Sequence, residues 1–201
     1  MKKKFIRNIL SLFFAVITIL NALPTFGKIK GNDSFIPQHI SEVEDTEWLV
    51  GIARRVITPA TGVWLAGYGV KRPVEGKLHD VWVKVLALKS KNGKRVVMVT
   101  TDIEGISRII YESVYKKVHE RFNLDRSEFM LTFSHNHSAP CLRGDLVDYY
   151  PSDDQQRKLV DEYSNWMEEK VIDAMDEALN NLQPAQVYKG EGLCTFAVNR
   201  R

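Results

Sequence analysis

The chain has 201 residues and carries 28 Lys and Arg against 25 Asp and Glu, which gives a formal net charge of +3. Four basic residues and no acidic ones lie in the first 27 positions, so the rest of the chain holds 24 basic against 25 acidic residues and is close to neutral. That balance leaves no basic stripe, and it excludes nucleic acid as an expected partner.

Residues 1–27 are typical of a secretory signal peptide. Three lysines and Arg7 precede an apolar run from Ile9 to Leu20, and short turn-forming residues follow. The run is shorter than the roughly 20 apolar residues that cross a bilayer, although an uncleaved anchor is the alternative. We therefore expect an exported protein, secreted or periplasmic, whose mature chain begins near Lys28.

The segment that follows, residues 28–47, is polar and contains turn-forming residues and a short acidic cluster. We expect it to be a flexible leader, and we assign no functional role to His39 within it. The folded part is predicted over residues 48–201. The roughly 170 residues after the signal segment suffice for one domain.

The first predicted strands lie over residues 49–57 and 78–88, which are rich in apolar and β-branched side chains. Asn92-Gly93 is a hairpin-turn signal and leads into a return strand over 95–101. The return strand is apolar on both faces, so we expect it to be central and covered on both sides. Between the first two strands, residues 62–69 are rich in glycine and aromatic residues, which suits a loop whose backbone must approach something closely.

Helical periodicity follows over residues 106–122 and again over 155–182, where Pro184 ends the pattern. Short strands are predicted at 129–133 and 186–188. Strands that alternate with helices argue for an α/β sandwich or a doubly wound layer. We therefore predict the α/β class, with a layered mixed sheet and flanking helices.

The strand over 129–133 leads into Ser134-His135-Asn136-His137-Ser138-Ala139-Pro140. In extended backbone, His135 and His137 point to the same side, so both imidazoles can converge at the end of a strand, where sites in α/β sheets lie. Such a pair can hold a metal ion, or place one metal-bound histidine beside a polarising one. The alternative is that both are polar loop residues that cap the following turn.

Three acidic residues and one further histidine are weaker candidates. Asp102 ends a strand, so it either orients a ligand histidine or caps the helix that begins near Ile106. Glu104 either caps the same helix or lines the site. His79-Asp80 is either a strand-entry turn or a second histidine of the site held by an acid.

The order of these motifs along the chain is more informative than any one of them alone. The strand Gly51-Ile52-Ala53-Arg54-Arg55-Val56-Ile57-Thr58-Pro59 is followed by Leu65-Ala66-Gly67-Tyr68-Gly69, by His79-Asp80, by Thr101-Asp102-Ile103-Glu104-Gly105 and by the histidine motif. This series resembles the N-terminal catalytic domain of the neutral/alkaline (non-lysosomal) ceramidases, which have His-Thr-His-Ser-Gly-Pro at the corresponding place. The resemblance runs from about Val50 to the C-terminus, where Asn199-Arg200-Arg201 is similar to a further family segment.

The resemblance implies a zinc-dependent amidase that cleaves an amide such as ceramide into a fatty acid and an amino alcohol. It implies that His135 is a zinc ligand and that His137 is a catalytic residue beside the metal. It also implies a lipid or other amide small molecule as substrate, and peripheral contact with a membrane in a longer form. The family completes its zinc site with a His, a Glu and a Tyr from later residues, so we expect this chain to be an incomplete portion of a larger α/β domain, inactive alone.

Two other interpretations stay open at this point. The chain could be a degenerate secreted domain that binds a ligand without catalysis, or its metal could be completed by His79 and Asp102. The two cysteines, Cys141 and Cys194, could pair in an exported protein, and a free thiol near the histidine motif is the alternative.

Overall fold

The computed structural model describes residues 39–42, 48–60, 62–70, 72–145 and 153–191. The predicted signal segment, most of the predicted leader and Cys194 lie outside these residues. The chain divides into two compact units, one formed by Trp48–Pro184 and the other by the remaining residues on either side of it. Among the described residues, no helix is long and apolar enough to span a membrane.

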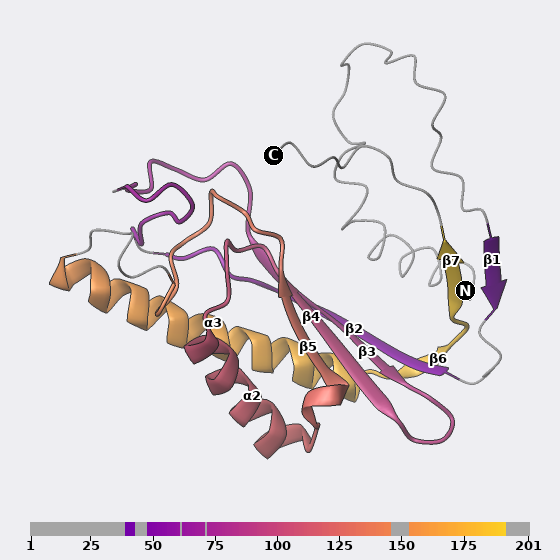
Figure 1. The fold of residues 1–201 in the computed structure, drawn as a ribbon. Helices are drawn as coiled ribbons and strands as arrows, with labels where there is room; N and C mark the ends of the chain where they lie inside the picture. Colours follow the sequence, from indigo (N-terminus) through magenta and orange to yellow (C-terminus); the bar gives the residue numbers. More distant parts are fainter. Residues whose placement is uncertain (1–38, 43–47, 61, 71, 146–152, 192–201) are drawn as a thin grey trace, which may run out of the picture. The chain divides into compact units, whose positions relative to one another are not determined.

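The larger unit is built on a mixed sheet with the strand order β5-β4-β3-β2-β6 (Figure 1). The strands β2 (Trp48–Val56), β3 (Trp82–Lys89) and β4 (Arg95–Thr101) form an antiparallel meander, and β5 (Phe129–Phe133) pairs with β4 in parallel. A parallel pair needs a long crossover, which is supplied here by a helix. The predicted α/β class with a mixed sheet and flanking helices is confirmed.

Two segments at the ends of the described chain differ from prediction. The expected strand at 186–188 is replaced by β6 (Gln183–Ala185) and β7 (Tyr188–Glu191). Within the predicted flexible leader, β1 (His39–Glu42) forms a strand that pairs antiparallel with β7 in a separate two-stranded sheet. The partner strand is about 150 residues away, so no local signal in residues 28–47 indicates this pairing.

The two main helices have clear caps. Helix α2 (Arg108–Phe122) begins after Ser107, whose side chain accepts a hydrogen bond from the backbone N–H of Ile110, and it ends at Asn123 in the left-handed conformation. The 3-10 helix η2 (Arg126–Glu128) then leads into β5. Helix α3 (Asp154–Asn180) begins after Asp153, whose carboxylate accepts from the N–H of Gln156.

Both helices pack against one face of the sheet, where the core lies (Figure 1). Val97 and Val99 of β4 are fully buried beneath them, with Val114 and Val118 of α2 above. On the other face, Val96 is 41% exposed. Strand β4 is central as expected, but within the described residues the helices cover only one of its faces, so the prediction of two-sided cover is not met.

A close approach between β2 and α3 depends on Gly51. A Cβ atom at this position would lie 1.7 Å from the carbonyl oxygen of Ala178 in α3, a distance that only movement of the helix could relieve. We expect Gly51→Ala to lower the free energy of unfolding by about 3 kcal/mol, the upper end of the range for overpacked cores, as measured by urea denaturation. Gly76→Ala is the matched control, because nothing lies within 4 Å of a Cβ there. Equal stabilities for the two variants would contradict this packing.

Candidate metal centre

The candidate site lies beyond the carboxyl ends of β4 and β5, within the larger unit. The backbone N–H of Ser134 donates to the carbonyl of Thr101 at 3.0 Å, and that of Asn136 donates to the carbonyl of Ile103 at 3.0 Å. These bonds continue the parallel pairing past the ends of both strands. The segment Asp102–Gly105 and the histidine motif are therefore held side by side, at the edge of the sheet where the sequence places them.

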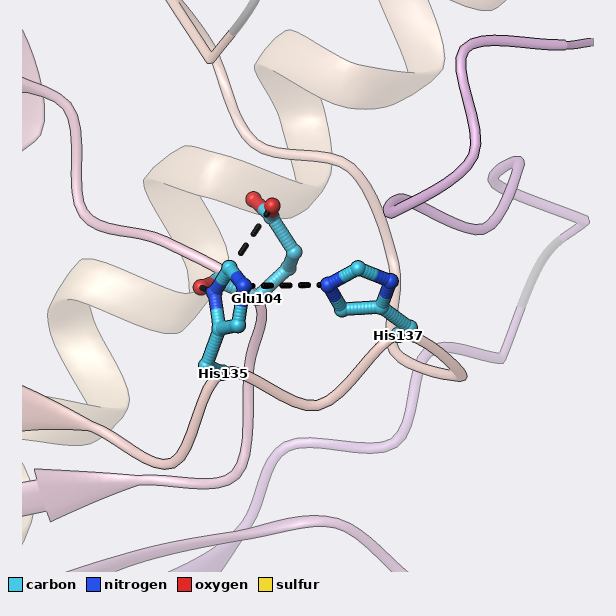
Figure 2. A group of neighbouring side chains, drawn as sticks. All are labelled: Glu104, His135 and His137. Atoms are coloured by element: carbon cyan, nitrogen blue, oxygen red, sulfur yellow. Dashed lines mark hydrogen bonds and ion pairs between the residues drawn. The ribbon is translucent and has the colours of Figure 1, made fainter. Parts of the chain in front are cut away.

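Three side chains converge there, those of Glu104, His135 and His137 (Figure 2). The two Nε2 atoms of His135 and His137 are 3.0 Å apart, and one ligand atom from each of the three residues lies within 4.8 Å of the others. The predicted convergence of the two imidazoles is confirmed. The expectation that Glu104 either caps a helix or lines the site is decided in favour of the site, because Ser107 caps α2.

The convergence has a different cause from the one expected. His135 has a φ of 58°, in the left-handed region that non-glycine residues seldom adopt, so the backbone does not continue as an extended strand through the motif. The turn brings Nδ1 of His135 to 2.8 Å from the backbone carbonyl oxygen of Glu104. The histidine pair is thus set by a turn anchored to the β4 segment, and not by alternation along a strand.

The hydrogen bonds assign the protons in the pair. A carbonyl oxygen can only accept, so Nδ1 of His135 carries a hydrogen and donates it to Glu104. In the neutral ring, Nε2 of His135 then has a free lone pair, and His137 donates from its own Nε2 to that lone pair. His135 therefore presents an unprotonated nitrogen, with its ring orientation fixed from the far side, which is the usual state of a metal-ligating histidine.

Glu104 is the buried member of the group, with 7% of its surface exposed. Its carboxylate lies 3.8 Å from Nδ1 of His135. Asp145, on the loop after the histidine motif, forms a hydrogen bond with Glu104; burial and this carboxyl pairing raise the pKa of Asp145 to about 7. Two carboxyl groups in contact favour a proton between them over two negative charges, which is why the pKa of Asp145 lies so far above its ordinary value.

Sequence reasoning did not single out Asp145, since it is one of several acids in a polar loop without a motif. It reaches the site because the neighbouring Arg143 is held to α3: its Nη2 atom donates to the carboxylate of Glu168 at 2.8 Å and its backbone N–H to Oγ of Ser164 at 2.9 Å. No pattern in the sequence would have identified that anchorage, because it joins residues that are 21 and 25 positions apart through a loop.

Asp102 has neither of its two expected roles. Its carboxylate accepts a hydrogen bond from the backbone N–H of Trp82 at 3.0 Å and lies 3.9 Å from Nζ of Lys84. The chain bends after β4, so this side chain faces β3 while Glu104 faces the histidines. Both expectations, a helix cap and an orienting carboxylate, were wrong.

His79-Asp80 forms a strand-entry turn, in agreement with the simpler of its two interpretations. His79 is exposed, and its Nδ1 atom lies 3.1 Å from the carbonyl of Asp80. The Asp80 carboxylate accepts from Lys77 at 2.8 Å and from Thr58 at 2.9 Å, and the Lys77 hydrogen bond is the largest cause of its lowered pKa. Among the described residues, the group that could hold a metal ion contains neither His79 nor Asp102, so the alternative of a metal completed by those two residues loses its support.

The pairing of Cys141 with Cys194 involves a residue outside the described part of the chain. Cys141 itself is a buried thiol next to the site, and its burial raises its pKa to about 12. A thiol with so high a pKa stays protonated at neutral pH, so Cys141 is a poor nucleophile and a poor metal ligand in this conformation.

Comparison with solved structures shows which known fold this is. A crystal structure of neutral ceramidase from Pseudomonas aeruginosa matches 70% of this chain with a TM-score of 0.59 at 20% sequence identity. The fold resembles part of a neutral ceramidase. A ceramidase complexed with C2 matches the same share of this chain, with a TM-score of 0.59 and 23% identity.

The two matches cover 23% and 22% of the ceramidase chains, so this chain spans less than a quarter of their length. No family model and no curated protein sequence matches the chain. The resemblance to ceramidases expected from the motif order is therefore confirmed at the level of the fold.

Proposed function

We propose that the chain forms the histidine-bearing part of an exported, zinc-dependent amide hydrolase of the neutral ceramidase type. Such an enzyme converts an N-acylsphingosine-like amide into a fatty acid and an amino alcohol. The observation that carries the proposal is the pair of Nε2 atoms of His135 and His137, 3.0 Å apart at the strand ends of a ceramidase-like fold. The proposal of export rests on residues 1–27 alone.

The donor set suits zinc. A zinc ion about 2.0–2.1 Å from Nε2 of His135 would lie beside His137, whose Nε2 is 3.0 Å from that of His135. The Glu104 carboxylate is a further donor in the group, whose ligand atoms lie within 4.8 Å of one another. Catalytic zinc usually has three protein ligands and an open position. We propose that His135 is a ligand and that residues beyond this chain complete the site, so that the chain alone is inactive.

When bound, zinc would supply a water of lowered pKa and would polarise the amide carbonyl. The residues of this chain hold and move the protons. His135 keeps its own proton on Nδ1, against the carbonyl of Glu104, and so leaves its Nε2 lone pair for the metal. With that lone pair taken up by zinc, His137 would no longer have it as an acceptor, and its Nε2–H could donate to the carbonyl oxygen of the substrate.

The surroundings of the two histidines suit a substrate with hydrocarbon chains. The exposed ring of Phe133 has its centroid 6.4 Å from that of His135, and the exposed ring of Tyr68 has its centroid 5.1 Å from that of His137. Apolar surface beside a polar centre is the usual form of a site for an amphipathic ligand. We propose a lipid amide as the substrate class, with contact to a membrane surface in the complete protein.

The test of the proposed function is hydrolysis of an N-acyl amino alcohol with a long acyl chain by the natural full-length gene product. We expect release of the fatty acid, loss of activity on zinc chelation and recovery on adding zinc. His137→Gln should lower kcat/KM by about 10²- to 10⁴-fold, the range for a general acid or base, while the exposed His79→Gln should change it less than about twofold. Activity that survives the chelator, or equal losses in the two variants, would contradict the proposal.

A further inference from the structure

The loop between β2 and β3 is joined to the histidine motif by backbone hydrogen bonds. Leu65 and Pro140 form an isolated antiparallel bridge, in which the N–H of Ala66 donates to the carbonyl of Ala139 at 2.9 Å and that of Cys141 to the carbonyl of Trp64 at 2.8 Å. The loop returns on itself where the N–H of Leu65 donates to the carbonyl of Arg72 at 2.9 Å. This loop, residues 64–70 and 72, is therefore the wall against which His137 lies.

Gly67 forms the part of the wall nearest to the imidazole. It has a φ of 111°, and a Cβ atom there would lie 2.5 Å from Cγ of His137 and 2.7 Å from its Nδ1. Backbone and ring are thus in direct contact, as expected for a loop so rich in glycine. The ring of Tyr68 meets the imidazole edge to face, with an interplanar angle of 80° and 5.1 Å between centroids. The position of this wall therefore decides where the His137 ring can lie.

Arg72 fixes the wall to the histidine motif. Its Nη1 atom donates to the carbonyl of His137 at 2.6 Å and to the carbonyl of Ala66 at 2.9 Å. One guanidinium therefore joins the two backbone segments that lie on either side of the His137 ring. The same guanidinium lies over the Tyr68 ring, with Cζ 4.6 Å from the centroid. Charged donors make short, strong hydrogen bonds, and cations over aromatic faces add further attraction.

We propose that Arg72 is a positioning residue for His137: it holds the backbone of His137 and the Gly67–Tyr68 wall together, and so keeps Nε2 of His137 directed at Nε2 of His135. The inference deepens the proposed function, since it concerns the same pair of imidazoles, but it is a statement about geometry that also holds without metal. A guanidinium suits the task better than an ammonium, because its planar fork bonds and stacks at the same time.

The first readout is the NMR spectrum of the imidazoles in the metal-free protein. In full-length protein labelled with ¹⁵N, long-range ¹H–¹⁵N spectra report the tautomer and the order of each imidazole, and His137→Gln identifies the His137 signals. We expect Arg72→Ala to broaden or shift the His137 ring signals and to leave those of His119 unchanged. Lys77→Ala is the matched control. It removes a cation from the same segment between β2 and β3, but the Lys77 side chain pairs with Asp80 and not with His137.

The second readout is kcat for hydrolysis of the long-chain N-acyl amino alcohol by the full-length protein. Because His137 is the group that Arg72 orients, we expect Arg72→Ala to lower kcat by about 10- to 100-fold, with Arg72→Lys intermediate and Lys77→Ala unchanged. If the parent hydrolyses no such amide, the proposed function fails while the spectra still test Arg72.

If Arg72 has only a structural role, Arg72→Ala will have a lower thermal midpoint, while the His137 signals and kcat at 25 °C stay as in the parent; that result would overturn the inference. Should Arg72→Ala fail to fold, Arg72→Lys takes its place, because it keeps the charge while removing the planar fork that bonds both carbonyls. His137 signals identical to the parent in Arg72→Lys would equally overturn the inference.

Discussion

Replacing His135 by alanine is expected to remove high-affinity zinc binding from the full-length protein, with a loss of at least about 100-fold in affinity. The replacement deletes the only one of the two imidazoles whose Nδ1–H is held by a backbone carbonyl and whose Nε2 lone pair is thereby exposed to a metal. A lost ligand should cost more than the roughly 10- to 100-fold that follows loss of an orienting partner. Isothermal titration of metal-free protein with zinc gives the affinity and the stoichiometry.

His79→Ala is the control for this experiment, because His79 is exposed and its hydrogen bond goes to the carbonyl of the adjacent Asp80, away from the site. We expect one zinc per chain in the parent and in His79→Ala. Glu104→Gln keeps the backbone carbonyl that orients His135 and removes only the carboxylate charge, so it should weaken binding less than His135→Ala. Unchanged affinity in His135→Ala would show that zinc, if bound at all, lies elsewhere.

The largest expected effect on stability comes from Glu168, in the middle of α3. This side chain is 1% exposed, and its carboxylate accepts from Oγ of Ser113 at 2.6 Å, from Nζ of Lys117 at 3.0 Å and from Nη2 of Arg143 at 2.8 Å. It therefore joins α3 to α2 and to the loop that carries Asp145. In Glu168→Ala two cations would remain close together without their shared buried anion.

We expect Glu168→Ala to lower the free energy of unfolding by about 3 kcal/mol, the lower end of the range for breaking a buried ion pair, because Lys117 and Arg143 keep partial access to water. Urea denaturation at constant salt measures the change. The control is Glu169→Ala, in which the neighbouring carboxylate, 60% exposed, loses its contact with the same Lys117; a surface pair of this kind contributes at most about 1 kcal/mol. Equal effects in both variants would mean that burial of Glu168 does not matter.

The elements of the larger unit could be predicted because each has a local signal. The Asn92-Gly93 turn fixes the hairpin between β3 and β4, and the spacing of Ile110, Val114 and Val118 gives the buried face of α2. The pairing of β1 with β7 could not be predicted, because strand partners distant in sequence leave no periodic trace in either strand. The same holds for the face of β4 that the helices of the described residues do not cover: its apolar residues indicate burial but do not show which element would cover them.

At the candidate site, the histidine motif could be found from its spacing, but the acid beside it could not. Asp102 and Glu104 are two residues apart after the same strand, and the sequence offers no reason to prefer either. The bend after Thr101 decides the matter by directing Asp102 to Trp82 and Lys84 and Glu104 to His135. Asp145 and Arg72 could not be identified as part of the site from the sequence, because each reaches the site through contacts between separate loops.

Locating the metal would decide whether His135 and His137 form part of a zinc centre. Crystals of the full-length protein as isolated, measured on both sides of the zinc absorption edge, would locate the metal by anomalous scattering. We expect a zinc peak about 2.0–2.1 Å from Nε2 of His135, with His137 adjacent. A map without zinc at this place, in which the two Nε2 atoms remain hydrogen-bonded to each other, would contradict it.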